Sequence, residues 1–394
     1  MSLSRVGHRD TSTPAKITDK HAENWIDEVE WARPEYDTQA VNRAGRLLAL
    51  NSEGDGQDNW LDYNSALLVA NNWRASHAYP LNTFQMYLRN VVKRYQSRPL
   101  VAQRVKRLAS IEGKLQRFST MRLSQMQDLG GCRAILPDVR TVFKVLKYYL
   151  EQSEIKHELV KLNDYVSEPK ESGYRGLHLV YSYFSDKGKV AYNGLKIEVQ
   201  LRSREQHAWA TAVETVGMFS GQALKSSMGS DEWQRFFALM GSALANSENS
   251  PPVPGTPEVH QEVVAKVKDY AQRLQVTRRL SEYGRALRLL NSAENDAHYY
   301  LLELNPEKGE LIVRGFQANQ TQQAEQEYAA AEKRAKQFRG RDAVLVSVDS
   351  IRALRKAYPN YFADTRAFAE LVEKTITPSR GVTVRERSVQ RLPT

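Results

Sequence analysis

The chain has little of what several common protein classes require. Its 394 residues include one cysteine, Cys132, which excludes an internal disulfide and any cysteine-rich zinc site. No apolar run approaches the roughly 20 residues needed to span a bilayer, and the first twenty residues lack the apolar core of a secretory signal. We therefore expect a cytoplasmic protein with no membrane partner.

The common signatures of ATP sites are missing as well. The sequence has no GxxxxGK[ST] loop and no kinase-like HRD or DFG pattern. Hydrophobic residues make up 41% of the chain and charged residues 26%, which is ordinary for a globular protein, and the length allows two or three domains. Any phosphate chemistry must therefore rest on another arrangement of cations and carboxylates.

Positive charge is in excess and is concentrated in one segment. The formal net charge is +10, which favours an anionic partner such as a nucleotide or a nucleic acid over an acid-binding or neutral one. The alternative is a basic but generic surface. Residues 81–130 hold ten lysines and arginines against two acids, a balance of +8 in fifty residues. These ten cations are Arg89, Lys93, Arg94, Arg98, Arg104, Lys106, Arg107, Lys114, Arg117 and Arg122.

Hydrophobic periodicity indicates where helices and strands lie. Residues 1–20 are polar and unpatterned, and we expect a disordered tail there. From about residue 34 to 98, apolar residues recur at the three- and four-residue spacing of helices. From about residue 100 the predicted order is β-α-β-β-β-α, which indicates an α+β domain with a mixed sheet flanked by helices. We place this domain, with its N-terminal helices, at residues 21–246.

A proline-rich segment separates this domain from the rest of the chain. Residues 247–258 have the composition of a linker. Residues 259–378 begin with a helical region to about residue 293 and continue as β-β-α-β-α, enough for a small α/β domain with a regulatory or interaction role. Within it, YPNYFADT is an aromatic, turn-like segment that suits either a contact surface or a packing or dimer element. Residues 379–394 form a basic tail.

The stretch KLNDYVSEPKESGYRGLH, residues 161–178, concentrates cations and aromatic side chains in one loop. Lys161, Lys170, Tyr174 and His178 lie in it, and it leads into the apolar strand LHLVYSY. A row of cations suits phosphates, and a tyrosine beside a glycine suits a stacked base, so this loop is a candidate ligand site. The alternative is a solvated surface hairpin.

Two acids stand where a metal ion could be held. Asp128 precedes the predicted strand CRAIL, in DLGG, whose glycines let the backbone approach a ligand closely. Glu198 lies in KIEVQL, a strand of period two whose polar face carries Glu198, Gln200 and Arg202. If the two strands are neighbours, the two carboxylates can hold Mg²⁺, which fills its remaining positions with water and substrate phosphates. The alternative is an ion pair of Glu198 with Arg202 or Lys196 on an exposed face.

Several cations accompany the two acids. Phosphoryl transfer depends mainly on positioning and on charge stabilisation around the transferring group, so it needs a metal and fixed cations. The candidates are Arg104, Lys106 and Lys114 in RVKRLASIEGK, Arg133 directly after the glycines, and Lys161 at a strand end.

Four ordered motifs together resemble the RelA/SpoT-type nucleotide pyrophosphokinase domain of the alarmone synthetases. They are RVKRLASIEGK, DLGGCRAI, DYVSEPKESGYRGLH and EVQLRSREQHAWA, and the similarity covers about residues 60–220. The resemblance implies a nucleotidyltransferase-like sheet and transfer of pyrophosphate from ATP to a ribose 3′-hydroxyl, usually of GDP or GTP. No HD hydrolase pattern lies upstream, so the chain looks like the small synthetases with an extra C-terminal domain.

The resemblance also implies a role for each candidate residue. Asp128 and Glu198 match the Mg²⁺-binding acids, and Glu198 also matches the base for the 3′-hydroxyl. Arg104 and Arg133 match the pair that sandwiches the ATP adenine, a cation–π arrangement. Tyr174 matches the aromatic residue that stacks on the acceptor guanine. The remaining matches are Lys106, Lys114 and Lys161 at the ATP phosphates, and Lys170, His178, Gln200 and Arg202 near the acceptor.

The identity of the molecule that accepts the pyrophosphate stays open. The GYRGLH and QHAWA variants also look like the toxin branch of the family, whose members pyrophosphorylate the tRNA 3′-CCA end or make adenosine alarmones. Some members carry a fused neutralising or phage-sensing domain, so a regulatory protein partner at the C-terminal domain and a homo-oligomer are further expectations. The basic segment cannot choose between a guanine nucleotide and tRNA, because ATP needs cations in either case. A third hypothesis is an inactive nucleotide-binding or RNA-binding regulator.

Overall fold

A computed structural model describes residues 31–50, 60–220, 231–286, 288–290, 297–305, 307–338, 341–348, 350–362 and 364–377. These residues all belong to one compact unit. The tails predicted at residues 1–20 and 379–394 lie outside the described residues. None of the described helices is long and apolar enough to cross a membrane.

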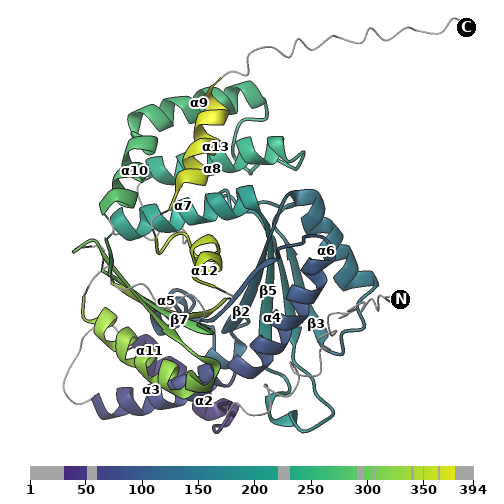
Figure 1. Cartoon of the computed structure of the whole chain (residues 1–394), viewed down its shortest axis with the longest axis vertical. Helices are drawn as coiled ribbons and strands as arrows, with labels where there is room; N and C mark the ends of the chain where they lie inside the picture. Colours follow the sequence, from purple (N-terminus) through teal and green to yellow (C-terminus); the bar gives the residue numbers. More distant parts are fainter. Residues whose placement is uncertain are drawn as a thin grey trace, which may run out of the picture. The chain divides into compact units, whose positions relative to one another are not determined.

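A mixed sheet of nine strands forms the centre of the described structure, in the order β3-β4-β5-β2-β1-β9-β7-β8-β6 (Figure 1). The pairs β2–β5 and β6–β8 are parallel and the other neighbours are antiparallel. The predicted α+β class with a mixed sheet is therefore confirmed. The strands are β1 (Leu100–Val105), β2 (Gly130–Leu136), β3 (Glu158–Asp164), β4 (Leu177–Ser182), β5 (Lys196–Ser203), β6 (Arg288–Leu290), β7 (Tyr299–Asn305), β8 (Glu310–Phe316) and β9 (Asp342–Ser347).

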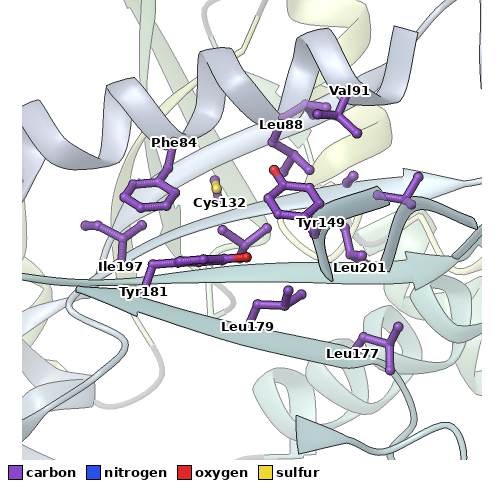
Figure 2. Packing of buried hydrophobic residues seen from close by; sticks show 14 of the residues in the cluster. Phe84, Leu88, Val91, Cys132, Tyr149, Leu177, Leu179, Tyr181, Ile197 and Leu201 are labelled. Atoms are coloured by element: carbon purple, nitrogen blue, oxygen red, sulfur yellow. The ribbon is translucent and has the colours of Figure 1, made fainter. Parts of the chain in front are cut away.

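One face of strands β1 to β5 is covered by helices α4 (Ala78–Lys93) and α6 (Val139–Glu151). Figure 2 shows Phe84 and Leu88 of α4 and Tyr149 of α6 packed with Cys132 and Ile197 of the sheet. Each such fully buried side chain contributes about 1.5–3 kcal/mol of hydrophobic stabilisation. Burial also raises the pKa of the Cys132 thiol, so this cysteine serves as a core residue.

A second group of helices precedes and follows β1. Helices α2 (Thr38–Leu50), α3 (Trp60–Ala75) and α5 (Leu108–Arg117) share their own apolar cluster, which includes Leu48 and Ile111. The helical pattern predicted for residues 34–98 is thus present. Strand β1 was not predicted, because its six residues LVAQRV are short and run into the basic segment.

A third helical cluster contains helices from both predicted domains. Helices α7 (Arg204–Ser220) and α8 (Asp231–Ser247) pack with α9 (His260–Arg273), α10 (Val276–Ala286) and α13 (Arg366–Ile376). The helix predicted to continue to about residue 293 is wrong at Arg288–Leu290, which pairs with β8 as a parallel strand. Short apolar runs such as this one suit either state, and strand pairing decides between them.

The C-terminal β-β-α-β-α order is present, and its strands extend the same sheet. Strand β9 pairs with β1, with Gln103 opposite Ser347 and Arg104 opposite Val346. Helix α11 (Thr321–Lys336) packs on β7 and β9, and α12 (Ile351–Ala357) packs on β1. In Figure 1, α11 lies on the same side as α3, and α12 lies between α7 and the sheet. Strands more than 200 residues apart in the chain therefore meet along the β1–β9 seam, where these two strands pair.

Candidate functional site

Strand register brings the predicted residues into two adjacent rows across one face of the sheet. Side chains alternate between faces along a strand, and directly paired residues share a face. In the first row Arg104 is opposite Gly131, and Gly131 is opposite Glu198. The same row continues through Val180 to Lys161. The strand that follows Asp128 and the strand of Glu198 are therefore neighbours, which was the condition for a shared metal ion.

The second row lies two residues along each strand. Arg133 is opposite Ala102 on one side and Gln200 on the other, and Gln200 is opposite His178. Residues between the rows, such as Cys132, face the buried core beneath α4. The candidate site thus occupies the sheet face that α4 and α6 leave open.

Asp128 precedes β2 and is held between two lysines. The Nζ atoms of Lys106 and Lys114 lie 2.7 and 3.0 Å from its two carboxylate oxygens. Burial alone would raise the pKa of Asp128, but the two ammonium groups outweigh burial and lower it to about 2. Burial lowers the pKa of Lys106. Asp128 is therefore an ionised carboxylate, beside two cations that can turn toward phosphate oxygens.

Glu198 is held by hydrogen bonds within the polar face of the sheet. Its Oε1 lies 2.8 Å from Nδ1 of His178, and its Oε2 accepts from Gln200 Nε2 at 2.5 Å. Burial would raise the pKa of Glu198, but its contacts with His178 and Gln200 bring the net pKa below its usual range. The alternative ion pair with Lys196 or Arg202 is wrong, since the carboxylate bonds other partners and its side chain is only 14% exposed.

The two carboxylates suit a magnesium ion. Both are ionised by the balance of burial and charged neighbours, and their strands are adjacent. Among the described residues, no group of three or more His, Cys, Asp or Glu side chains could hold a metal by itself. Mg²⁺ needs only one or two protein carboxylates, with waters and substrate phosphates as its other ligands. Asp128 and Glu198 therefore fit this ion.

Tyr174 is connected to Glu198 through His178. The Tyr174 hydroxyl lies 2.5 Å from His178 Nε2 and accepts from Arg202 Nη2 at 3.0 Å. With Nδ1–H of His178 donating to the Glu198 carboxylate, Nε2 accepts from the tyrosine hydroxyl. The Nζ of Lys170 lies over the Tyr174 ring, 5.6 Å from its centroid. A base that stacks on this face of the ring must therefore displace Lys170.

Lys161 lies at the far end of the first row. It is exposed on strand β3, two strands away from Glu198. Because neighbouring strands are about 4.8 Å apart, its backbone is about 10 Å from that of Glu198. Lys161 can therefore contact only a ligand that extends across the sheet.

Arg133 is covered by an aromatic ring that sequence analysis did not assign to the site. The Arg133 guanidinium carbon lies 4.4 Å from the centroid of Tyr358, and its Nη2 donates to the carbonyl oxygen of Ala357. Burial lowers the pKa of Arg133 to about 10, so it stays a cation at neutral pH. The face of one arginine of the predicted adenine pair is thus taken by a ring from the C-terminal part of the chain.

The sequence around these residues matches a known family. Residues 103–218 match the family model described as "Region found in RelA / SpoT proteins". This chain carries a RelA/SpoT-type domain. The match includes Asp128, Glu198, Tyr174 and the cations of both rows, and it ends within helix α7.

Curated relatives of this RelA/SpoT-type domain include two proteins of Bacillus subtilis (strain 168). GTP pyrophosphokinase YwaC is 30% identical over 114 residues, which is 27% of this chain and 52% of that protein. GTP pyrophosphokinase YjbM is 34% identical over 113 residues, which is 28% of this chain and 52% of that protein. The chain thus spans about half the length of the curated relatives it matches.

Solved structures similar to the chain include small alarmone synthetase 1 from Bacillus subtilis bound to its product pppGpp. That structure has 23% sequence identity and a TM-score of 0.38, and the similarity covers 49% of this chain and 94% of that one. A GTP pyrophosphokinase family protein from Streptococcus pneumoniae has 23% identity and a TM-score of 0.36, over 51% and 93% of the two chains.

The C-terminal segment that carries Tyr358, helix α12 and the turn after it, lies outside the RelA/SpoT-type domain and is attached to it at several points. The Tyr358 hydroxyl donates to the carbonyl oxygen of Gln103 at 3.2 Å. Nε2 of His207 lies 3.1 Å from the carbonyl oxygen of Lys356, and Arg107 Nη1 donates to the Tyr361 hydroxyl at 3.1 Å. These contacts join α12 and the turn after it to β1, α7 and the start of α5 (Figure 1).

A second element outside the RelA/SpoT-type domain holds the loop that carries Tyr174. Nη1 of Arg175, the residue after Tyr174, lies 2.6 Å from Oε2 of Glu248 just after α8, and the two side chains are 2% and 7% exposed. Glu248 also accepts from Ser203 Oγ at 2.5 Å and from Gln206 Nε2 at 3.1 Å. Sequence analysis missed Glu248, which stands in the predicted linker, because nothing local marks its partner 73 residues away.

The same loop also approaches helix α8 very closely at Gly173. Its φ of +91° is in the left-handed region, and a Cβ there would lie 2.6 Å from the carbonyl oxygen of Phe237. A Cβ on Gly241 would meet the Gly173 carbonyl oxygen at 2.7 Å. Two glycines and one buried ion pair thus hold the loop against α8.

We expect Glu248→Gln to lower the free energy of unfolding by about 3–5 kcal/mol, because it leaves the Arg175 guanidinium buried without a counter-charge. Denaturant unfolding of the purified protein measures this change. Glu232→Gln, which breaks an ion pair of half-exposed side chains with Arg273, is the control and should cost less than about 1 kcal/mol. Equal effects of the two substitutions would contradict the role of Glu248.

Proposed function

We propose that this chain transfers a pyrophosphoryl group from ATP to the ribose 3′-hydroxyl of GDP or GTP in a Mg²⁺-dependent reaction. The observation that carries the proposal is the pair of ionised carboxylates, Glu198 on β5 and Asp128 just before the adjacent strand β2. Lys106 and Lys114 bond Asp128, and Tyr174 is linked to Glu198 through His178. The names of the curated relatives, both GTP pyrophosphokinases, support the same chemistry.

The donor side of the site is assigned to the cations of β1, β2 and α5. Arg104 and Arg133 share one face of neighbouring strands, so their planar guanidinium groups can lie against an adenine ring. Lys106 and Lys114 turn from Asp128 to the phosphates of ATP. When bound, Mg²⁺ supplies charge neutralisation at the transferring group between Asp128 and Glu198.

Glu198 is assigned as the general base that takes the proton of the acceptor hydroxyl. The 3′-oxygen forms a bond to the β-phosphorus of ATP, the bond from that phosphorus to the α–β bridging oxygen breaks, and AMP leaves. The proton of the 3′-hydroxyl moves to the Glu198 carboxylate, which is ionised in the resting site. His178 orients that carboxylate and connects it with Tyr174, whose ring is assigned to stack on the nucleobase of the acceptor.

The C-terminal segment is assigned to control of this reaction. The Tyr358 ring lies over the Arg133 guanidinium, the group that is assigned to the adenine, and the Ala357 carbonyl takes one of its donors. ATP and Tyr358 therefore compete for Arg133. A partner or ligand that releases the segment would activate the enzyme, and one that holds it would keep the enzyme inactive.

A tRNA 3′ end is the second candidate acceptor, because much of the basic segment is not used by the site. Five of its cations are exposed, and the +8 balance of residues 81–130 suits contacts with a phosphate backbone. These exposed cations are Lys93, Arg94, Arg98, Arg117 and Arg122.

One experiment tests the proposed function and separates the acceptors. Purified protein is incubated with Mg²⁺ and ATP labelled in the β-phosphate, together with GDP, GTP or deacylated tRNA in separate reactions. We expect label in the guanine nucleotide. Label in tRNA alone would move the proposal to the second acceptor. A Tyr358→Ala variant with no transfer to any acceptor would favour an inactive regulator.

We expect Tyr174→Ala to raise the KM for the acceptor by about 5- to 150-fold with a much smaller change in the KM for ATP, because base stacking contributes about 1–3 kcal/mol. Steady-state kinetics with each substrate varied in turn measures both constants. Tyr174→Phe is the matched variant: it keeps the ring and loses the bonds to His178 and Arg202, so it should lower kcat more than it raises the acceptor KM. Equal losses toward ATP and acceptor in Tyr174→Ala would rule out stacking.

A further inference from the structure

A cavity of about 330 Å³ lies at the β1–β9 seam, on the face of the sheet opposite the proposed active site. One wall comes from α3, α4 and β1, and the other comes from β7, α11 and β9. Apolar side chains such as Leu81 and Leu345 and the ring of Tyr328 line it. The size is that of a small-molecule site.

Two acceptor oxygens of residues that line this cavity have no hydrogen-bond partner. Gln103 is only 6% exposed, and its Oε1 atom has no hydrogen-bond partner. The Oδ1 atom of Asn71 is buried in the same way. A buried acceptor without a partner costs about 1–3 kcal/mol, so a ligand with matching N–H groups gains this energy on binding. The carboxyl group of Glu325 adds two further acceptor oxygens to the lining.

Positive charge is not available for a phosphate in this cavity. Nη1 of Arg74 lies 2.6 Å from Glu332 Oε2, and both side chains are at most 10% exposed. Arg104 also borders the cavity, but it follows Gln103 in β1 and its side chain points to the opposite face of the sheet. The lining thus fits a flat, uncharged molecule that donates hydrogen bonds.

We propose that this cavity binds a neutral purine nucleoside or base with adjacent N–H donors, guanosine being the representative, and that the bound molecule holds the C-terminal segment on β1. Guanine carries N–H donors at N1 and N2 on one edge, which pair with neighbouring acceptor oxygens. The aromatic and apolar walls cover the faces of the ring.

The cavity is coupled to Arg133 through Gln103. The side chain of Gln103 faces the cavity, its backbone pairs with Ser347 of β9, and its carbonyl oxygen accepts from the Tyr358 hydroxyl. Because both walls are needed to form the cavity, its ligand binds the joined state of β1 and β9 and not the separated one. At a concentration of 100 times its Kd, the ligand shifts the joined-to-separated ratio by about 100-fold. Guanosine is therefore an inhibitor of ATP use.

Titration calorimetry of the full chain with guanosine tests the binding. We expect saturable binding that is weakened at least about tenfold with inosine, which lacks the N2 amine, and at least about tenfold in Gln103→Leu. Tyr174→Ala, which alters the proposed acceptor site, should keep the guanosine binding that Gln103→Leu weakens. So should Glu327→Gln, because Glu327 is on α11 but bonds Arg314 outside the cavity.

Thermal unfolding separates loss of the site from loss of the fold. Gln103→Leu removes a buried acceptor without a partner, so the ligand-free variant should have a Tm equal to or above that of the wild type, and guanosine should raise the Tm of the wild type only. Absence of guanosine binding, or binding that Gln103→Leu leaves unchanged, would mean a cavity filled by water only and would overturn the proposal. The inhibition of ATP use by guanosine rests on the proposed function, but the binding measured by calorimetry does not. Guanosine binding by a protein that transfers no pyrophosphate would therefore contradict the proposed function alone.

Discussion

Tyr358→Ala should increase pyrophosphate transfer at limiting ATP and lower the KM for ATP by on the order of 10- to 100-fold. The substitution removes a ring from the Arg133 guanidinium, worth up to about 2 kcal/mol when desolvated. It also removes the hydrogen bond from the Tyr358 hydroxyl to Gln103, worth about 1 kcal/mol. Together these amounts shift the balance toward an open Arg133 by about two powers of ten.

Steady-state kinetics with ATP varied, and the acceptor at a fixed concentration, measures this effect. Phe362→Ala is the matched control, because Phe362 belongs to the same segment but its ring contacts Arg355 and not Arg133. Tyr358→Phe keeps the ring and loses only the hydroxyl, so its KM for ATP should lie between those of the wild type and Tyr358→Ala. An unchanged KM in Tyr358→Ala would show that the ring does not compete with adenine.

Glu198→Gln should lower kcat by about 10²–10⁴-fold, the range that a positioned general base contributes, while ATP still binds. The amide keeps the shape of the side chain, but its single oxygen can accept from only one of His178 and Gln200, and it cannot take the acceptor proton. Single-turnover transfer from labelled ATP measures the rate, and calorimetry in the Tyr358→Ala background measures ATP binding.

The control for Glu198→Gln is Glu158→Gln, on the exposed edge strand β3, which should leave transfer unchanged. A Glu198→Gln protein with wild-type activity would remove this residue from the mechanism. Loss of ATP binding together with activity would instead give Glu198 a structural or metal-holding role alone.

Local patterns were enough to predict part of the site. The period of two in KIEVQL placed Glu198, Gln200 and Arg202 on one face of β5, and the structure has them there, in hydrogen-bond contact with one another. CRAIL was predicted as a strand and forms most of β2, which begins two residues earlier, at Gly130, shortly after Asp128. Alternation of side chains along a strand is a property of the backbone itself, so it can be read without knowing any neighbour.

Register and long-range contacts were not predictable in the same way. The pairing of Gly131 with Glu198 places the two acids together, but it depends on how α4 and α6 pack on β2 and β5. A shift of one residue would turn either strand over and move its polar residues into the core. Packing, which involves residues far apart in the chain, therefore determines the register.

By itself the sequence determined the residue types of the site, the α+β class and the motifs of a RelA/SpoT-type domain. The tertiary structure alone decided that Tyr358 lies on Arg133, that Glu248 holds Arg175, and that Gln103 faces a cavity at the β1–β9 seam. Motifs and periodicity come from the chemistry and geometry of neighbouring residues. The Tyr358 contact joins segments more than 200 residues apart, and it forms because the free edge of β1 and the open face of Arg133 are satisfied by the same C-terminal segment.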